Sequence, residues 1–235
     1  MVISVPLSEV TTALGIGRRS HVALVGGGGK TTILHALGAQ LEGGRVLTTT
    51  TRMGRDQHGG LPVLIDPTDD ELHAATGEGA VLVWARIEGD KGVGVEPEHC
   101  DRWSRTFDHV LVEADGSQHR PFKAPADHEP VVPRTATLVV SMIGADALGR
   151  VIADQCHRPL RVAALAGCGP YERLTPSGAA TVLLHERGAR RAVPPTARFA
   201  VVITKVDDAT ADAVGDLSAE LLHRDPDVAV IAVGS

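Results

Sequence analysis

The sequence predicts an α/β fold in which helices cover both faces of a mostly parallel central β-sheet, forming a three-layer sandwich. Short apolar stretches alternate along the chain with segments of helical periodicity, and this alternation is typical of βαβ units. The apolar stretches are nearly continuous runs of Val, Leu, Ile and Ala, as in strands that are buried on both faces. With 235 residues, of which 43% are hydrophobic, the chain can form one substantial core. We therefore expect a single domain over residues 1–235.

The individual elements follow from hydrophobic periodicity and from residues that begin or end helices. Strands are expected at His21–Val25, Arg45–Thr48, Pro62–Ile65, Val81–Arg86, Val110–Glu113, Thr137–Met142, Phe199–Thr204 and Val228–Val233. Helices are expected at Thr31–Leu41, Glu98–Arg105, Pro159–Ala166, Pro176–Glu186 and Ala209–His223, with a short one after the N-cap residue Thr68. Segment Arg120–Arg134 contains four prolines, so we expect a fixed loop there. A small helical insertion is expected around residues 144–195, because Pro194-Pro195 separates a helical region from the next strand.

Composition and charge argue against several classes of protein. The formal net charge is −6, whereas nucleic-acid binding needs an excess of Lys and Arg. Aromatic residues, at 3%, offer few stacking platforms for bases. No apolar run approaches the ~20 residues that span a bilayer, Met1–Thr11 lacks the pattern of a secretory leader, and three widely spaced cysteines do not suggest a disulfide framework. We expect a cytoplasmic protein without nucleic-acid or membrane partners.

The most informative segment follows the first expected strand, where four consecutive glycines precede Lys-Thr-Thr and a helical pattern. Its candidate phosphate-binding residues are Gly26, Gly27, Gly28, Gly29, Lys30, Thr31 and Thr32. Glycines allow several backbone N–H groups to point at one anion, and the helix N-terminus adds unpaired amides and a positive dipole end. Lys30 would supply an ammonium group to the terminal phosphates, and the Thr31 hydroxyl would hold Mg²⁺. This segment predicts a P-loop for a nucleoside triphosphate, and therefore a P-loop NTPase-like sandwich.

The spacing departs from the standard P-loop pattern in one place. The pattern G-x-x-x-x-G-K-[ST] requires glycine at position 24, where this chain has Leu24. The glycines begin only at Gly26, so we expect a shortened or reshaped loop. The alternative is a flexible glycine linker that happens to precede Lys-Thr, although linkers rarely lie between a strand and a helix.

A second strand ends in two carboxylates, Glu113 and Asp115. Side-chain alternation places both on the same side of the chain. At the carboxyl end of a strand beside the phosphate loop, such carboxylates can hold Mg²⁺ or position an attacking water. We therefore expect Lys30, Glu113 and Asp115 to act in catalysis. The expected Mg²⁺ ligands are Thr31, Glu113 and Asp115. The alternative is a strand-end turn in which Asp115-Gly116 only favours tight geometry.

The segment Thr204-Lys205-Val206-Asp207 has the [NT]-K-x-D pattern with which guanine-nucleotide proteins read the base. One carboxylate can accept hydrogen bonds from both guanine N1–H and the exocyclic amine, and adenine offers no such pair. The stem of Lys205 would lie along the base or the loop. In the alternative, Asp207 only caps the helix that follows. GTP and ATP therefore both remain open as the nucleotide.

Two further segments lie where switch or substrate groups are expected. Thr50, Thr51 and Arg52 close the second strand, where hydroxyls and a guanidinium suit contacts to the γ-phosphate or its Mg²⁺. Alternatively, β-branched residues simply end the strand there. The proline-rich loop and its approach supply the other candidates, His119, Arg120, Lys123, His128 and Glu129. Rigid loops at the carboxyl ends of strands direct groups toward substrates, whereas a metal site in this loop would match no standard ligand spacing.

Taken together, these segments resemble the YqeC family. The resemblance runs from Val5 to Gly234 and is carried by Val25–Leu34, Thr48–Arg52, Val112–Pro133, Met142–Asp146, His157–Pro159 and Thr204–Asp207. Its most specific block runs from Glu113-Ala114-Asp115-Gly116 through Lys123-Ala124-Pro125 to Glu129-Pro130. The positions that match the family pattern residue by residue are Lys30, Thr31, Glu113, Asp115 and Lys123. Family members usually have asparagine near position 204, where this chain has Thr204.

The resemblance implies an accessory protein of a selenium-dependent molybdenum hydroxylase. It also implies kinship with P-loop maturation GTPases such as the urease and hydrogenase accessory proteins and MobB. We expect Mg²⁺-dependent binding of GTP or ATP and slow hydrolysis until a partner completes the site. Hydrolysis would change the order of the loops at Thr48–Arg52 and Asp115–Arg134 and gate delivery to the client.

The expected partners are the nucleotide and a client molybdenum hydroxylase or cofactor-biosynthesis protein, with a homodimer left open. Two rival functions also remain open. One is a small-molecule kinase or nucleotidyltransferase in which Arg52, Arg120 and Lys123 hold an acceptor. The other is a non-catalytic maturation chaperone whose nucleotide is only structural.

Overall fold

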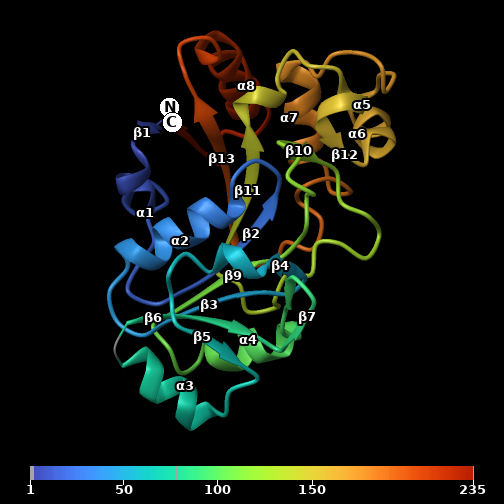
Figure 1. The fold of residues 1–235 in the computed structure, drawn as a ribbon. Helices are drawn as coiled ribbons and strands as arrows, with labels where there is room; N and C mark the ends of the chain where they lie inside the picture. The colour runs from blue at the N-terminus through green and yellow to red at the C-terminus, as the bar shows by residue number, and fades with distance from the viewer. Residues whose placement is uncertain (1–2, 78, 235) are drawn as a thin grey trace.

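The computed structural model describes residues 3–77 and 79–234 and is built on one large sheet (Figure 1). Nine strands of the described residues form this sheet: β1 (Ile3–Val5), β2 (Ser20–Gly26), β3 (Arg45–Thr49), β5 (Val63–Ile65), β6 (Ala80–Trp84), β9 (His109–Glu113), β11 (Leu138–Gly144), β13 (Arg198–Val206) and β14 (Ala229–Gly234). Their order is β1-β14-β13-β11-β2-β9-β3-β6-β5, and every neighbouring pair is parallel. The predicted α/β fold with a parallel sheet is confirmed.

Helices cover both faces of the sheet, and one face is covered by more helices than the other. The helices are α1 (Val10–Ala13), α2 (Lys30–Gln40), α3 (Asp69–Thr76), α4 (Pro97–Trp103), α5 (Ile152–Gln155), α6 (Pro159–Ala166), α7 (Pro176–Leu184) and α8 (Ala211–Arg224). One face packs against α1 and α2, where Ile33, Leu34 and Leu37 form one apolar cluster with the sheet. The opposite face packs against α3 and α4 over one half and against α6, α7 and α8 over the other. The result is a three-layer sandwich, as predicted.

The predicted elements are present with ends that differ by a few residues. All eight predicted strands belong to the large sheet, and the helix after Thr68 begins with a capping box between Thr68 and Glu71. Strand β1 was not predicted, because three residues are too few for a periodic pattern and its position depends on distant pairing with β14. The predicted strand Val81–Arg86 ends at Trp84 instead. Of the single domain predicted over residues 1–235, residues 1, 2, 78 and 235 lie outside the described residues.

A small antiparallel sheet stands at one end of the large sheet. It consists of β4 (Arg52–Gly54), β8 (Lys91–Val93) and β7 (Arg86–Glu88), in that order. Two glycines allow the small sheet to pack closely against the large one. A β-carbon at Gly92 would lie 2.1 Å from the Trp84 ring, and one at Gly94 would lie 2.1 Å from the Thr49 carbonyl oxygen. The pairing of β4 with β8 was not predicted, because it spans more than thirty residues of intervening chain. The hairpin of β7 and β8, which turns at Gly89-Asp90, was also missed, although its two-residue turn is local.

Helices α5, α6 and α7 fall within the predicted helical insertion at 144–195 and lie together beside α8 and β13 (Figure 1). In this region β12 (Cys156–His157) pairs in parallel with β10 (Phe122–Lys123), which belongs to the proline-rich loop. The helices share one apolar cluster with the central sheet, and the domain boundaries stay a prediction. Among the described residues, no helix is both long enough and apolar enough to cross a bilayer.

The topology brings several strand ends to one edge of the large sheet. Strand β2 lies between β9 and β11, with Leu24 opposite Glu113 and Gly26 opposite Met142. Because these strands are parallel, the segments after β2, β3, β9, β11 and β13 all leave the sheet at the same edge. The predicted site residues come from these segments.

Candidate functional site

The segment between β2 and α2 forms a tight curl that only glycine can build. Gly26 and Gly28 have positive φ angles of +92° and +86°. A β-carbon at Gly26 would lie 2.5 Å from the Met142 carbonyl oxygen, and one at Gly28 would lie 2.3 Å from the Gly144 nitrogen. The backbone conformation and the close approach of β11 therefore both require glycine at these positions.

The departure from standard P-loop spacing is accommodated by strand β2. Leu24 is fully buried within β2, and the strand continues to Gly26. The Gly27 N–H donates to the Met142 carbonyl oxygen at 3.1 Å, and a β-carbon at Gly27 would lie 2.5 Å from the Arg120 carbonyl oxygen. The loop is thus reshaped and held between β11 and the loop after β9.

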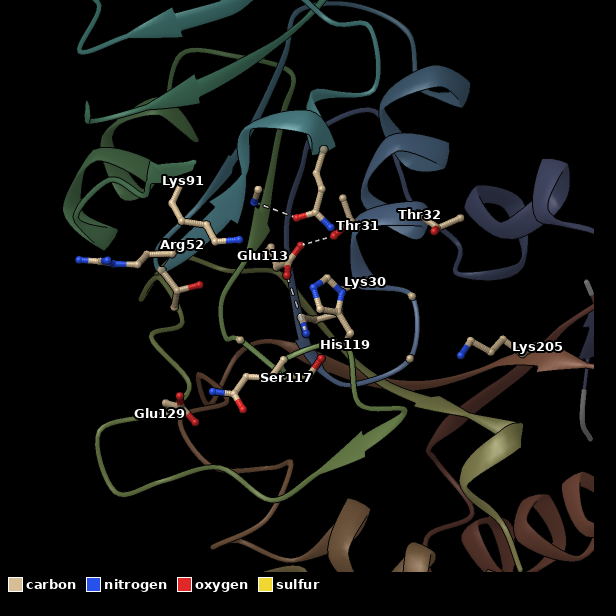
Figure 2. Close-up of a pocket in the computed structure, with 17 residues that line it drawn as sticks. Lys30, Thr31, Thr32, Arg52, Lys91, Glu113, Ser117, His119, Glu129 and Lys205 are labelled. Atoms are coloured by element: carbon tan, nitrogen blue, oxygen red, sulfur yellow. Dashed lines mark hydrogen bonds and ion pairs between the residues drawn. The ribbon is translucent and has the colours of Figure 1, made fainter. Parts of the chain in front are cut away.

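The remaining amides of the curl are available to a ligand. The N–H groups of Gly28 and Gly29 donate to no other residue in the described part of the chain, and helical geometry leaves the first-turn amides of α2 without an intrahelical acceptor. The residues that carry these amides are Gly28, Gly29, Lys30, Thr31 and Thr32, and all of them line one pocket of about 740 Å³ (Figure 2). Converging N–H groups at a helix N-terminus favour an anion.

The Lys30 side chain is buried, and its ammonium group lies inside the curl. Its Nζ donates to the Gly26 carbonyl oxygen at 2.6 Å and lies 3.3 Å from Asp115 Oδ1 and 3.8 Å from Glu113 Oε1. Thr31 Oγ1 donates to Glu113 Oε2 at 2.9 Å. The lysine, the hydroxyl and both carboxylates are therefore neighbours, as their sequence positions indicated.

Burial raises the pKa of the Glu113 carboxyl above its ordinary value, and the charge of Lys30 and the hydrogen bond from Thr31 counteract only part of this shift. A raised pKa means that the buried carboxyl keeps its proton to a higher pH than an exposed glutamate does. A cation arriving beside Glu113 would favour the carboxylate and release that proton.

Asp115 lies beneath the pocket and fixes the start of the curl. It is 2% exposed, and both of its carboxylate oxygens accept the Gly26 N–H, at 3.1 and 3.0 Å. Lys30 and Lys123 flank it, with Lys123 Nζ at 3.2 Å from Oδ2. Asp115 is not among the described residues that line the pocket, so its part in binding Mg²⁺ stays a prediction.

Lys123 extends this network of charges toward the loop after β9. Its Nζ donates to the Gly116 carbonyl oxygen at 2.7 Å and to Glu129 Oε2 at 2.8 Å, and Arg158 Nη2 donates to Glu129 Oε1 at 2.9 Å. Burial alone would raise the pKa of Glu129, but the hydrogen bond and charge of Lys123 hold it below its ordinary value. Positive and negative groups thus alternate from the curl to Arg158, which directly follows β12. This pairing stabilises buried charges that would be costly alone.

The predicted site residues divide into two groups. Those that line the pocket are Gly28, Gly29, Lys30, Thr31, Thr32, Thr51, Arg52, Glu113, His119, Glu129 and Lys205. Those that are absent from its wall, among the described residues, are Gly26, Gly27, Thr50, Asp115, Arg120, Lys123, His128, Thr204 and Asp207. The first group comes from the ends of β2, β3, β9 and β13, as the parallel topology requires.

The segment after β13 reaches the pocket through Lys205. Thr204 is buried, and its Oγ1 donates to the Gly28 carbonyl oxygen at 2.5 Å, which ties this strand to the curl. Asp207 is exposed, and its Oδ1 accepts from the N–H and the hydroxyl of Thr210 at 2.9 and 2.7 Å. Asp207 therefore stabilises the turn before α8 but does not cap the helix, whose N-cap residue is Thr210. Its part in reading the base stays a prediction.

Three other predicted residues lie away from the pocket wall, and two of them make hydrogen bonds elsewhere. Thr50 Oγ1 donates to the Val131 carbonyl oxygen at 2.8 Å. The Arg120 guanidinium donates to the Asp154 carbonyl oxygen, and His128 is exposed. Their functional roles stay predictions.

The pocket also contains residues that the sequence analysis missed, chiefly Lys91, Ser117 and Gln118. Ser117 and Gln118 directly follow the carboxylates at the end of β9. Their position after a strand could have indicated that they lie near the site. Lys91 gave no such signal, because its place depends on the pairing of β8 with β4.

The described residues at this site would supply only part of the oxygen ligands that Mg²⁺ needs. Within the described residues, no group of three or more His, Cys, Asp or Glu side chains is placed to hold a metal ion. The Thr31 hydroxyl and the Glu113 carboxylate, 2.9 Å apart, are oxygen donors of the kind that Mg²⁺ prefers. Mg²⁺ is usually bound through one or two such groups plus substrate phosphates.

We therefore expect Mg²⁺ alone to leave the melting temperature of the protein unchanged and to raise it once a triphosphate is present. The physical reason is that the protein offers too few ligands until the phosphates supply the rest. Thermal unfolding with and without Mg²⁺ and nucleotide measures this. An equal rise in melting temperature with Mg²⁺ alone would contradict the expectation that the phosphates supply part of the Mg²⁺ ligands.

Two comparisons with known proteins show the family to which this chain is related. A family model described as "YqeC protein" matches residues 22–160, a range that contains the curl, both carboxylates of β9 and the network around Lys123. The chain is 32% identical over 201 residues to a protein of Escherichia coli (strain K12) named "Uncharacterized protein YqeC", and the match covers 81% of this chain and 78% of that relative. From both similarities, the chain belongs to the YqeC family.

Proposed function

We propose that this protein binds a magnesium nucleoside triphosphate and hydrolyses it slowly, acting as an accessory protein in the maturation of a molybdenum hydroxylase. The observation that supports this most strongly is the set of free amides from Gly28 to Thr32, which converge on a pocket beside Lys30 and Glu113. The charge of the pocket also supports it. The chain carries a net charge of −6, yet the buried cation Lys30 lies in the pocket lining at the curl.

Each group of the site has a role in this proposal. The first-turn amides of α2 bind the terminal phosphates, and Lys30 exchanges its bond to the Gly26 carbonyl for one to phosphate. Thr31 and Glu113 hold Mg²⁺, which neutralises charge that develops on the phosphates. Positioning and charge stabilisation account for most phosphoryl-transfer catalysis, and turnover is slow where no partner completes the site.

Calorimetric titration with the magnesium complexes of ATP and GTP, followed by an assay of phosphate release, tests the proposal. We expect saturable binding of at least one triphosphate and turnover no faster than ~0.01 s⁻¹ for the isolated protein. Absence of heat with either nucleotide would contradict the proposal, and so would rapid turnover without a partner.

The products of the reaction distinguish the rival functions. Phosphate released without any acceptor favours hydrolysis, whereas transfer that occurs only with a cofactor precursor favours the kinase or transferase. Loss of client maturation in a folded Lys30→Ala variant would contradict a purely structural nucleotide.

Binding of the magnesium triphosphate should strengthen as pH rises and should release a proton. Burial raises the pKa of Glu113, so a fraction of this carboxyl is protonated at pH values where exposed carboxyls are ionised, and Mg²⁺ displaces that proton. Calorimetric titration in buffers that differ in ionisation enthalpy measures how many protons are released on binding. The variant Glu113→Gln should release none, and proton release equal to that of the unaltered protein would contradict this role.

Base selection should depend little on Asp207. Because its carboxylate is exposed and engaged by Thr210, we expect Asp207→Ala to change the ratio of GTP to ATP affinity by less than about threefold, whereas loss of a guanine-specific carboxylate would cost far more. The neighbouring exposed Asp208 supplies the control variant Asp208→Ala. A tenfold or larger loss of GTP preference confined to Asp207→Ala would instead assign base reading to this residue.

A further inference from the structure

The pocket has a second wall opposite the curl, built from the small antiparallel sheet and the segment after Asp115. We call it the facing wall, and define it as Arg52, Lys91, Ser117, Gln118 and His119, which all line the pocket. In Figure 2 the ammonium end of Lys91 points toward Glu113, and His119 lines the same pocket as Lys30. The facing wall therefore borders the place where the terminal phosphate of a bound triphosphate would lie.

The cationic half of the facing wall is held by tight packing. The Gly94 N–H donates to the Thr51 carbonyl oxygen at 2.7 Å, and neither Gly92 nor Gly94 leaves room for a β-carbon. These contacts pack β8 closely against the end of β3, and Lys91, at the start of β8, pairs with Asp90 at 3.5 Å. Arg52 begins β4 beside it and pairs with Glu88 at 2.7 Å.

The other half of the facing wall is held in an unusual backbone conformation. Gln118 and His119 are consecutive non-glycine residues with positive φ angles of +50° and +61°. Such conformations are energetically unfavourable for residues other than glycine and cluster at functional sites. Within the described chain, the side chains of Ser117, Gln118 and His119 make no hydrogen bond, so a hydroxyl, an amide and an imidazole are free to bind a ligand.

We propose that the facing wall binds a second, small anionic ligand that carries a phosphate monoester group, next to the terminal phosphate of the nucleotide. This inference rests on the proposed triphosphate site. Arg52 and Lys91 supply the charge that an oxyanion needs, and Arg adds a planar set of donors that matches phosphate oxygens. Ser117, Gln118 and His119 supply hydrogen bonds to the rest of the ligand. A curl that holds only a triphosphate would not need this additional set of groups.

Inorganic phosphate tests the proposal when it is titrated into protein that is already saturated with Mg²⁺ and a triphosphate whose β,γ-bridge is methylene. The analogue fills the curl, so phosphate that binds must occupy another position. Ionic strength is held constant with chloride to separate binding from screening. We expect saturable phosphate binding, weakened at least ~10-fold in the double variant Arg52→Gln/Lys91→Gln, while the affinity for the analogue changes much less.

Arg86→Gln is the matched control. Arg86 pairs with the same Glu88 at 2.7 Å, and it is not among the described residues that line the pocket. This variant should bind phosphate as the unaltered protein does.

The outcomes separate the two proposals. If the analogue fails to bind, the triphosphate site and this inference both fall. If the analogue binds but phosphate does not saturate, or if the double variant binds phosphate equally well, only the second-ligand site is overturned. An equal loss of analogue and phosphate in the double variant would place Arg52 and Lys91 on the nucleotide itself and would also overturn it.

Discussion

Replacing Lys30 with alanine is expected to weaken binding of the magnesium triphosphate by about 100-fold, because charge-assisted hydrogen bonds to phosphate contribute roughly 1.5–3 kcal/mol each. Lys30 is buried at the centre of the curl, with its ammonium 2.6 Å from the Gly26 carbonyl oxygen. No other described cation lies inside the curl, since Lys123 is bound beneath it by Asp115 and Glu129. Calorimetric titration gives the two dissociation constants.

The fold should tolerate this substitution. Without Lys30, Asp115 still accepts the Gly26 N–H and still faces Lys123. Glu113 loses its nearest cation, but burial already raises the pKa of this carboxyl, so it can take up a proton in place of the ion pair. Urea unfolding of Lys30→Ala checks that the protein remains folded.

Lys205 provides the matched control for Lys30. It lines the same pocket, but its side chain is 49% exposed, and solvent weakens the interaction of an exposed cation with phosphate. Lys205→Ala should therefore weaken triphosphate binding far less than Lys30→Ala. Equal dissociation constants for Lys30→Ala and the unaltered protein would show that phosphate does not bind in the curl.

The second large effect is expected at Asp115, where substitution by alanine should lower the free energy of unfolding by about 3–5 kcal/mol. This carboxylate lies between the buried ammonium groups of Lys30 and Lys123 and also accepts the Gly26 N–H. Removing it leaves two buried cations next to each other and an amide without an acceptor. Urea unfolding measures the loss.

Asp127→Ala is the control for Asp115→Ala, because Asp127 is also ion-paired, to Arg161, but its side chain is 81% exposed. It should leave the unfolding midpoint unchanged, since exposed ion pairs contribute little. Asp115→Asn keeps the size of the side chain and an acceptor for the Gly26 N–H, so it should destabilise less than alanine. A loss under ~1 kcal/mol for Asp115→Ala would show that the network does not stabilise the curl.

The parallel sheet could be predicted because its strands are short, continuous apolar runs separated by helical segments. The same reasoning located the curl and Glu113, since both directly follow such strands and parallel strands end at one edge of the sheet. Local sequence contains this information: Thr68 with Glu71, for example, predicts a helix start and forms a capping box.

Features that depend on distant contacts could not be predicted. Lys91 reaches the pocket because β8 pairs with β4 and because Gly92 packs on Trp84, and no local pattern indicates either contact. Asp115 was expected to face the ligand together with Glu113, yet the lysines on both sides and the Gly26 amide hold it beneath the pocket wall. Alternation along a strand specifies a side of the chain, whereas the partners of each side chain depend on tertiary packing.

The most direct test of the phosphate-binding curl is the response of its own backbone amides to nucleotide. A two-dimensional ¹H–¹⁵N spectrum, recorded while a magnesium triphosphate is added, reports on each N–H group separately. We predict that the resonances of Gly28 and Gly29, whose amides have no acceptor among the described residues, shift most and saturate together with those of the first turn of α2. Saturable binding that leaves these amides unmoved, or no response to any triphosphate, would contradict the proposed site.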